Sequence, residues 1–135
     1  MKIKLIDHGY SRIPQRAHYN DSGADIFAVE NVALAPFSVT PVATGIGVEL
    51  PDGYDAVIHC KSGLSANGIL IANAPIDAGY RGEIYAILFN SNDKLYFINK
   101  GEKIGQLVVR PVIYADFVEE LGVEREDGAF GSTGR

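Results

Sequence analysis

Cysteine and long apolar segments are what this sequence most clearly lacks. Cys60 is the only cysteine among 135 residues, which excludes an intrachain disulfide, a CxxC pair and a Cys-rich zinc site and fits a reducing compartment. No uninterrupted apolar run approaches the roughly 18 residues of a membrane span, and residues 1–9 lack the apolar core of a signal sequence. We therefore expect a cytoplasmic protein with no membrane partner.

Positive charge is also scarce. Twelve Lys and Arg stand against seventeen Asp and Glu, for a formal net charge of -5, so we expect no nucleic-acid partner. A polyanionic ligand must then bind at a locally basic site. His8, His18 and His59 are dispersed without metal-ligand spacing, so the sequence predicts no direct metal site.

Stretches free of glycine and proline are short, because fifteen Gly and six Pro are scattered along the chain. This composition favours many short strands over multi-turn helices and predicts an all-β sandwich, barrel or jelly roll. A single helical turn is expected near 62–67. The expected strands are 2–6, 25–29, 45–50, 54–58, 69–72, 84–89, 95–98 and 104–112.

Two segments carry further predictions about organisation. Pro51, Asp52 and Gly53 have turn chemistry, which predicts a hairpin between the strands at 45–50 and 54–58. The length allows one domain, which we place at residues 1–121. Residues 122–135 offer one large apolar side chain, Phe130, among glycines and charges, and are expected to form a flexible tail that either frays or orders over a ligand.

Four polar stretches with glycine interrupt the predicted strands: 21–25, 61–65, 77–83 and the tail. Singly, each is typical of a turn. Lys61, Ser62 and Gly63 nevertheless combine a cation, a hydroxyl donor and a glycine that lets backbone N–H groups approach a phosphate. Neither a Walker loop nor a GxGxxG fingerprint is present, which excludes P-loop and Rossmann chemistry.

The order of these stretches resembles the trimeric all-β dUTPase family, in which five motifs occur in fixed order. The corresponding segments are 17–26, 61–65, 76–83, 103–107 and 125–134. The resemblance implies a distorted jelly-roll or β-barrel-like protomer and a homotrimer with active sites shared between subunits. It also implies hydrolysis of dUTP to dUMP and pyrophosphate, which limits uracil incorporation into DNA and supplies dUMP for thymidylate synthesis.

The resemblance assigns the chemistry to Asp77, which would orient and deprotonate the water that attacks the α-phosphorus. Mg²⁺ would be held by triphosphate oxygens and water and not directly by the protein. Tyr80 would stack under the deoxyribose and reject ribonucleotides; it is equally typical of an ordinary strand aromatic.

Further positions follow from the same resemblance. The inner phosphates would be held by Lys61, Ser62, Gly63 and Gln106, and the tail would contribute Arg125, Ser132 and Thr133 at the γ-phosphate, with Phe130 and Gly131 closing over the uracil.

Uracil selection would use main-chain groups of 73–80, including Ile76, with a side-chain contact from Asn73. Tyr85 is either a further substrate contact or a plain strand aromatic. Asp25 is either electrostatic support for the phosphate site or a structural carboxylate paired with a nearby cation.

Two departures and two alternatives accompany the resemblance. Lys61 stands where the family usually has Arg, and the third motif lacks a Gly-Thr pair before Ile76, which shortens the hairpin. A dCTP deaminase, or its bifunctional relative, needs a glutamate where alignment places Ile87, which cannot transfer protons. A non-catalytic nucleotide-sensing regulator on the same fold is opposed by the retained Asp77 and the tail.

Overall fold

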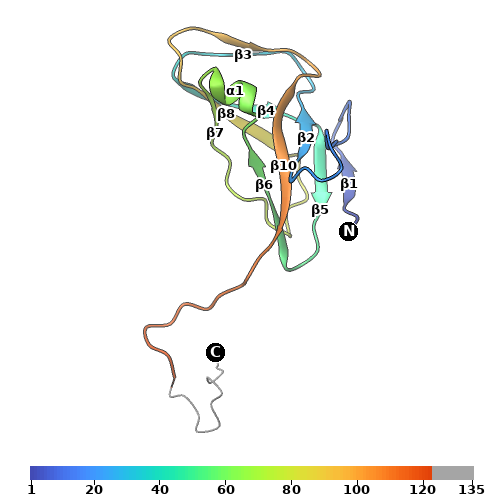
Figure 1. The fold of residues 1–135 in the computed structure, drawn as a ribbon, viewed down its shortest axis with the longest axis vertical. Helices are drawn as coiled ribbons and strands as arrows, with labels where there is room; N and C mark the ends of the chain where they lie inside the picture. The colour runs from blue at the N-terminus through green and yellow to red at the C-terminus, as the bar shows by residue number, and fades with distance from the viewer. Residues whose placement is uncertain (123–135) are drawn as a thin grey trace.

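A computed structural model describes residues 1–122 and places them in short strands joined by tight turns (Figure 1). The elements are β1 (Lys4–Asp7), β2 (Ala24–Phe27), β3 (Val32–Leu34), β4 (Ser38–Ala43), β5 (Ile46–Glu49), β6 (Tyr54–His59), α1 (Ser62–Ala66), β7 (Ile69–Ile71), β8 (Tyr85–Asn90), β9 (Tyr96–Ile98) and β10 (Lys103–Pro111). The predicted all-β class is confirmed. Within residues 1–122 there is no helix of the length and apolarity that a membrane crossing requires.

The strands form four small antiparallel sheets. Two are three-stranded, in the orders β2-β10-β6 and β4-β8-β7, and two are pairs, β1-β5 and β3-β9. Neighbours in a sheet are mostly distant in sequence, so the chain crosses repeatedly between sheets, as in a jelly roll.

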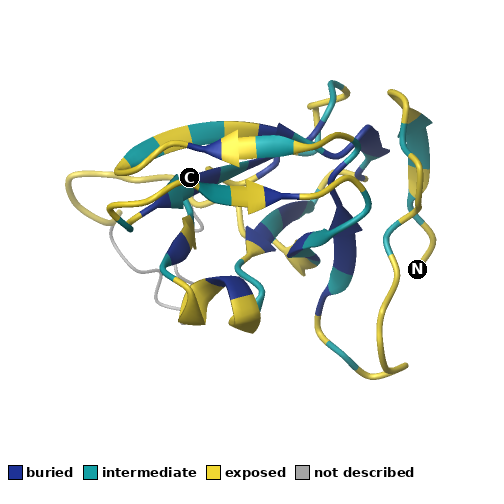
Figure 2. Ribbon diagram, turned by 90° about the horizontal axis from the view of Figure 1, so that it is seen from above, coloured by how far each residue is buried: buried dark blue, intermediate teal, exposed yellow. Residues whose placement is uncertain are grey.

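The core lies between these sheets and follows the two-residue period of their strands. Along β8, Ala86, Leu88 and Asn90 are buried while Tyr85 is exposed. Figure 2 shows buried segments on the interior strands, whereas α1 presents mostly exposed residues. The buried amide of Asn90 is satisfied, because its Nδ2 donates to the carbonyls of Leu34 (3.0 Å) and Lys94 (2.8 Å), as a buried polar group requires.

The sequence analysis missed two strands, β3 and β4. β4 contains Pro41, whose ring removes a backbone donor and weakens a strand pattern. The structure places β4 at the edge of its sheet, where it pairs with β8 over six residues and Pro41 lies opposite Ile87. An edge position tolerates proline because the outer side of the strand has no partner to lose.

The predicted hairpin between 45–50 and 54–58 is wrong. The turn itself forms, with Gly53 at φ 89° and Tyr54 N–H donating to Pro51 O. The strands it joins pair elsewhere: β5 with β1, and β6 with the long β10 over six residues. Consecutive strands pair only about two times in three, and the nine-residue β10 offers β6 the longer ladder.

The chain leaves the body of the fold after β10. Figure 1 shows this segment, in orange, running away from the sheets. Gly53 N–H donates to the Tyr114 hydroxyl at 2.7 Å and fastens its start. On either side of Tyr114, Ile113 and Phe117 are 90% and 96% exposed, and Val118 and Leu121 are also exposed. We call residues 112–122 the arm.

Candidate active site

A pocket of about 260 Å³ lies between the segment that joins β7 to β8 and the start of β8. Its lining brings together five predicted site residues, all from one hairpin. The lining residues are Asn73, Ala74, Pro75, Ile76, Asp77, Tyr80, Glu83, Ile84, Tyr85 and Ile87. We call this the hairpin pocket.

Asp77 is positioned by a bridge on one side and a turn on the other. Ile76 exchanges both backbone hydrogen bonds with Ala56 of β6, at 2.7 and 3.0 Å, and its side chain is buried. Tyr80 N–H then donates to Asp77 O at 3.0 Å, which closes a turn. The Asp77 side chain is exposed at the rim of the pocket. A fixed backbone with a solvent-facing carboxylate suits a group that must meet a water molecule.

Asn73 ties the two sides of the hairpin together with its side chain. Its Nδ2 donates to Tyr85 O and its Oδ1 accepts from Ile87 N–H, both at 2.8 Å. Both polar ends of the amide are thus engaged within the protein. Asn73 therefore shapes the pocket, because these two bonds join the segment after β7 to the start of β8.

Glu83 is a pocket residue that the sequence analysis did not single out. One of its carboxylate oxygens accepts from Gly45 N–H at 3.0 Å and the other from the Tyr85 hydroxyl at 3.3 Å. The negative charge of Glu83 is the main reason that the pKa of Tyr85 is raised above its usual value. A Gly-Glu pair does not indicate this role, because the Gly45 N–H that Glu83 accepts lies 38 residues earlier in the chain.

A second group of predicted residues lies on the sheet β2-β10-β6. Gln106 of β10 stands opposite Asp25 of β2 on one side and His59 of β6 on the other. Its side chain packs on Gly23, where an added Cβ would come within 2.8 Å of the Gln106 Cβ. The first and fourth motifs are thus side by side. We call the group formed by Asp25, Lys61, Ser62, Gly63 and Gln106 the polar cluster.

The second motif reaches the polar cluster from the end of β6. The chain leaves β6 at His59, and Lys61 follows as the residue before α1. Ser62 and Gly63 open the helix and are exposed. The first N–H groups of a helix have no partner within it and remain available to an acceptor.

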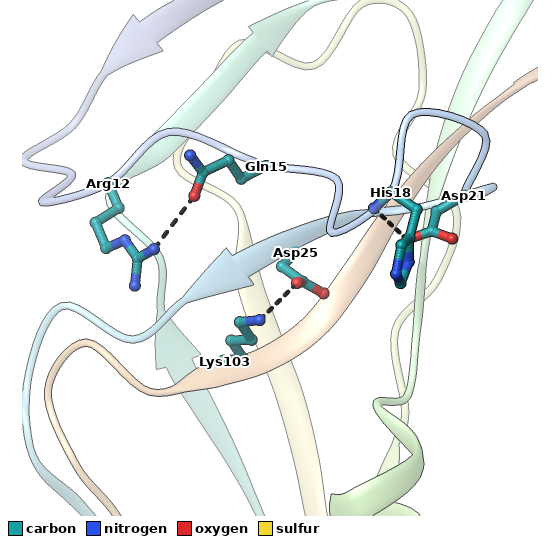
Figure 3. Close-up of polar contacts among 6 residues, drawn as sticks. All are labelled: Arg12, Gln15, His18, Asp21, Asp25 and Lys103. Atoms are coloured by element: carbon teal, nitrogen blue, oxygen red, sulfur yellow. Dashed lines mark hydrogen bonds and ion pairs between the residues drawn. The ribbon is translucent and has the colours of Figure 1, made fainter.

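Asp25 forms an ion pair with Lys103, at 3.1 Å, with its own side chain only 7% exposed (Figure 3). The same view shows His18 and Asp21 in the neighbouring first motif. The pKa of Asp21 is lowered, chiefly because its carboxylate accepts the His18 backbone N–H, at 2.9 Å. Lys61, in contrast, makes no ion pair within residues 1–122.

The hairpin pocket and the polar cluster lie on opposite edges of β6. Ile76 bridges to Ala56 on one edge, and Gln106 pairs with His59 on the other, three residues farther along. Three residues of strand span about 10 Å. No member of the polar cluster lines the hairpin pocket. The predicted site residues therefore form two separate groups within one chain.

The five predicted tail residues, Arg125, Phe130, Gly131, Ser132 and Thr133, lie outside the described residues. Within residues 1–122, no three His, Cys, Asp or Glu side chains gather as a protein metal cage would need.

The structure thus describes an all-β protein that carries a hairpin pocket lined by Asp77 and Tyr80 and a separate polar cluster on a neighbouring sheet. Comparison with known proteins identifies the family to which such a protein belongs. A dUTPase family model matches residues 9–134. The deoxyuridine 5'-triphosphate nucleotidohydrolase of Clostridium tetani is 42% identical over 142 residues, covering 100% of this chain and 97% of the relative. That of a Hydrogenobaculum species is 46% identical, covering 90% of each.

Solved structures of dUTPases have the same fold as this chain. A mutant dUTPase of Staphylococcus bacteriophage 80alpha, with dUpNHpp, is 30% identical, with a TM-score of 0.80 over 99% of each chain. A mutant dUTPase of S. aureus phage phi11, in which a structural Mg(II) ion is coordinated, is 28% identical, with a TM-score of 0.79 over 89% of this chain and 98% of the other. The chain belongs to the dUTPase family, and its activity is the hydrolysis of dUTP as a dUTP diphosphatase.

Proposed function

We propose that this dUTPase works as a homotrimer in which each active site combines the hairpin pocket of one copy with the polar cluster of another. The observation that carries the proposal is the separation of these two groups on opposite edges of β6. A nucleoside triphosphate needs a base pocket and a phosphate site in continuity, and one chain alone does not join them.

Two exposed apolar surfaces support an oligomer. The outer face of sheet β4-β8-β7 places Val39 and Leu70 on either side of Phe89, and Val39 and Leu70 are both largely exposed. This face continues into the hairpin pocket through Ile87 and Tyr85. The arm adds Ile113 and Phe117. Apolar surface of this extent is typical of a protein interface.

The hairpin pocket would receive the uracil and the deoxyribose. Main-chain groups of residues 73–80, including those of Ile76, would read the donor and acceptor order of uracil, while Asn73 holds the hairpin at the required width. Tyr80 would stack under the sugar and exclude a 2′-hydroxyl. A wall that leaves no space disfavours a ribose because the 2′-hydroxyl would overlap the ring and would be left without a hydrogen-bond partner.

The polar cluster would bind the inner phosphates. Lys61 supplies a positive charge, Ser62 a hydroxyl donor, and Gly63 a backbone N–H that a phosphate oxygen can approach closely. Gln106 adds a side-chain amide donor from the centre of the sheet. Asp25 is already paired with Lys103, so it would act on the phosphates only through the electrostatic field.

Asp77 would orient the attacking water and accept its proton as the oxygen attacks the α-phosphorus. Pyrophosphate leaves and dUMP remains. The exposed Asp77 carboxylate forms no ion pair within residues 1–122, so it is free to hold a water molecule. An aspartate is a weak base, and correct placement must supply much of the acceleration.

Mg²⁺ can bind in this arrangement without a full set of protein ligands. The ion keeps several waters and is commonly bound by substrate phosphates with one or two carboxylates at most. At the rim of the hairpin pocket Asp77 is the exposed carboxylate that could meet such a water. When bound, the ion would neutralise charge on the phosphate oxygens. We propose no side chain as its direct ligand.

The tail would complete the site from above the nucleotide. In this proposal Arg125, Ser132 and Thr133 meet the γ-phosphate, and Phe130 and Gly131 close over the uracil. An arginine donates a pair of parallel hydrogen bonds to phosphate oxygens and suits the end of a triphosphate.

The direct test is incubation of the purified protein with dUTP, dCTP, dTTP and UTP, each with Mg²⁺ and with a chelator. Pyrophosphate release and the identity of the base are followed, and mass in solution is measured by light scattering. We expect pyrophosphate from dUTP alone, dependence on Mg²⁺ and a trimeric mass. A monomeric mass with full activity would contradict the shared site, and ammonia from dCTP would restore the deaminase alternative.

A further inference from the structure

The ring of Tyr80 is held both at its hydroxyl group and along one face. Its hydroxyl donates to Glu83 O at 2.7 Å, and its backbone N–H belongs to the turn that starts at Asp77. The residue as a whole is 44% exposed, so contacts on its buried side fix the position of the ring.

Gly82 provides that packing. A Cβ added at Gly82 would lie 2.6 Å from the Tyr80 hydroxyl oxygen and 2.8 Å from the ring carbon that carries it. The phenol therefore rests directly on the glycine backbone. Gly82 is not among the glycines with positive φ, so close contact with the ring, and not backbone conformation, is what requires glycine here.

Gly82 is supported in turn by a strand and by the N-terminal segment. A Cβ added at Gly47 of β5 would lie 2.9 Å from Gly82 O and 3.0 Å from the His8 ring. His8 Nε2 donates to Arg81 O at 3.1 Å. The loop that carries Tyr80 is thus pressed against β5 and fastened by His8.

We propose that Gly82, backed by Gly47 and His8, sets the height of the Tyr80 ring and thereby the rejection of ribonucleotides. We call these three residues the glycine floor. The inference rests on the proposed function, in which Tyr80 stacks under the deoxyribose. A ring that rises or tilts away from Glu83 O no longer stacks flat on the deoxyribose and no longer blocks a 2′-hydroxyl. Discrimination by a wall of this kind depends on sub-ångström placement.

The test compares kcat/KM for dUTP and for UTP in Gly82→Ala and in the unmodified protein. We expect the dUTP-to-UTP ratio to fall at least about tenfold, since a methyl group forced against a packed ring displaces it. Ser11→Thr is the control. It also adds one methyl group, at an exposed position outside residues 73–80 and the polar cluster, so the ratio should stay as in the unmodified protein. An unchanged ratio in a folded Gly82→Ala protein would overturn the glycine floor.

A second pair of variants separates this inference from the function beneath it. Tyr80→Ala should itself lower the ratio; if it does not, the stacking role of Tyr80 fails. With the ring absent, adding Gly82→Ala removes no further contact, so the double variant should match Tyr80→Ala in ratio. If Gly82→Ala alone fails to fold, the double variant should recover folding. A double variant that still fails, or whose ratio falls again, would show that Gly82 acts elsewhere.

Discussion

The hairpin pocket and the polar cluster differ in how complete each is within one chain. The pocket is built from one continuous segment, fixed by the Ala56–Ile76 bridge, the two Asn73 bonds and the Glu83 carboxylate. The polar cluster draws on three motifs far apart in sequence, and two of its members, Ser62 and Gly63, are exposed. In the proposed function, this difference means that base and sugar recognition is organised within the protomer, whereas phosphate binding requires assembly of the oligomer.

The largest effect should come from the one residue expected to do chemistry. Asp77→Asn keeps the shape of the rim and removes the base, so turnover of dUTP should fall about 10²-fold or more while nucleotide binding persists. Steady-state kinetics and a binding titration measure the two quantities. Asp93→Asn, the same change at an exposed position between β8 and β9, should leave both unchanged. Full turnover in Asp77→Asn would remove Asp77 from the mechanism.

Removal of residues 122–135 should act on catalysis and not on folding. The sheets and the buried core all lie within residues 1–111, so the truncated chain should keep its thermal transition and its oligomeric mass. Its kcat/KM for dUTP should fall at least about tenfold, because the groups proposed for the γ-phosphate and uracil are gone. If the truncated chain unfolds, the tail is structural.

Charge at position 61 tests the polar cluster. Lys61→Glu places like charge beside the phosphates and should raise KM at least about tenfold. Lys61→Arg should retain activity, because a guanidinium keeps the positive charge and can donate two parallel hydrogen bonds to a phosphate. Lys94→Glu, the same reversal at an exposed position beyond β8, is the control for net charge. Equal kinetics in Lys61→Glu and Lys94→Glu would place the phosphates elsewhere.

Asn73→Ala tests whether the pocket is held by its own hydrogen bonds. Loss of the bonds to Tyr85 O and Ile87 N–H should lower the free energy of unfolding by about 1–3 kcal/mol. Urea denaturation measures this quantity, and KM for dUTP should rise in parallel as the hairpin loosens. Asn99→Ala is a suitable control, because Asn99 is exposed and forms its hydrogen bonds with Glu102 through its backbone N–H and carbonyl, which the substitution keeps. A wild-type denaturation midpoint in Asn73→Ala would contradict the role given to Asn73.

The smallest effect concerns the Glu83–Tyr85 contact. The pKa of Tyr85 is raised by Glu83, so the contact favours the folded state at neutral pH, and its contribution is lost as pH rises past the ordinary tyrosine value towards the raised one. Glu83→Gln should lower the pKa of Tyr85. Absorbance titration of tyrosinate, with Tyr85→Phe as the reference, follows this one group; an unshifted titration would mean that Glu83 does not act on it.

Local chemistry made some features predictable and long-range packing hid others. Asp77, Tyr80 and Lys61 stand in short motifs, so the sequence alone could predict them as site residues. Gly47 and His8 lie far from Tyr80 in the chain, and Glu83 is held by the N–H of Gly45, 38 residues earlier, so no local pattern encodes these contacts. The edge strand β4 was missed because Pro41 weakens its pattern, and the hairpin at Gly53 was wrong because turn chemistry does not determine which strands pair.

The most direct test of the shared site is to mix two impaired variants, Asp77→Asn and Lys61→Glu, let their subunits exchange, and assay at a dUTP concentration below the KM of the unmodified protein, where both variants hydrolyse dUTP slowly. Each variant alone carries one defective half in every site. If each site joins the hairpin pocket of one copy to the polar cluster of another, about a quarter of the sites in a random mixture should regain both intact halves, and dUTP hydrolysis should return. Activity no higher than the sum of the separate variants would contradict the account.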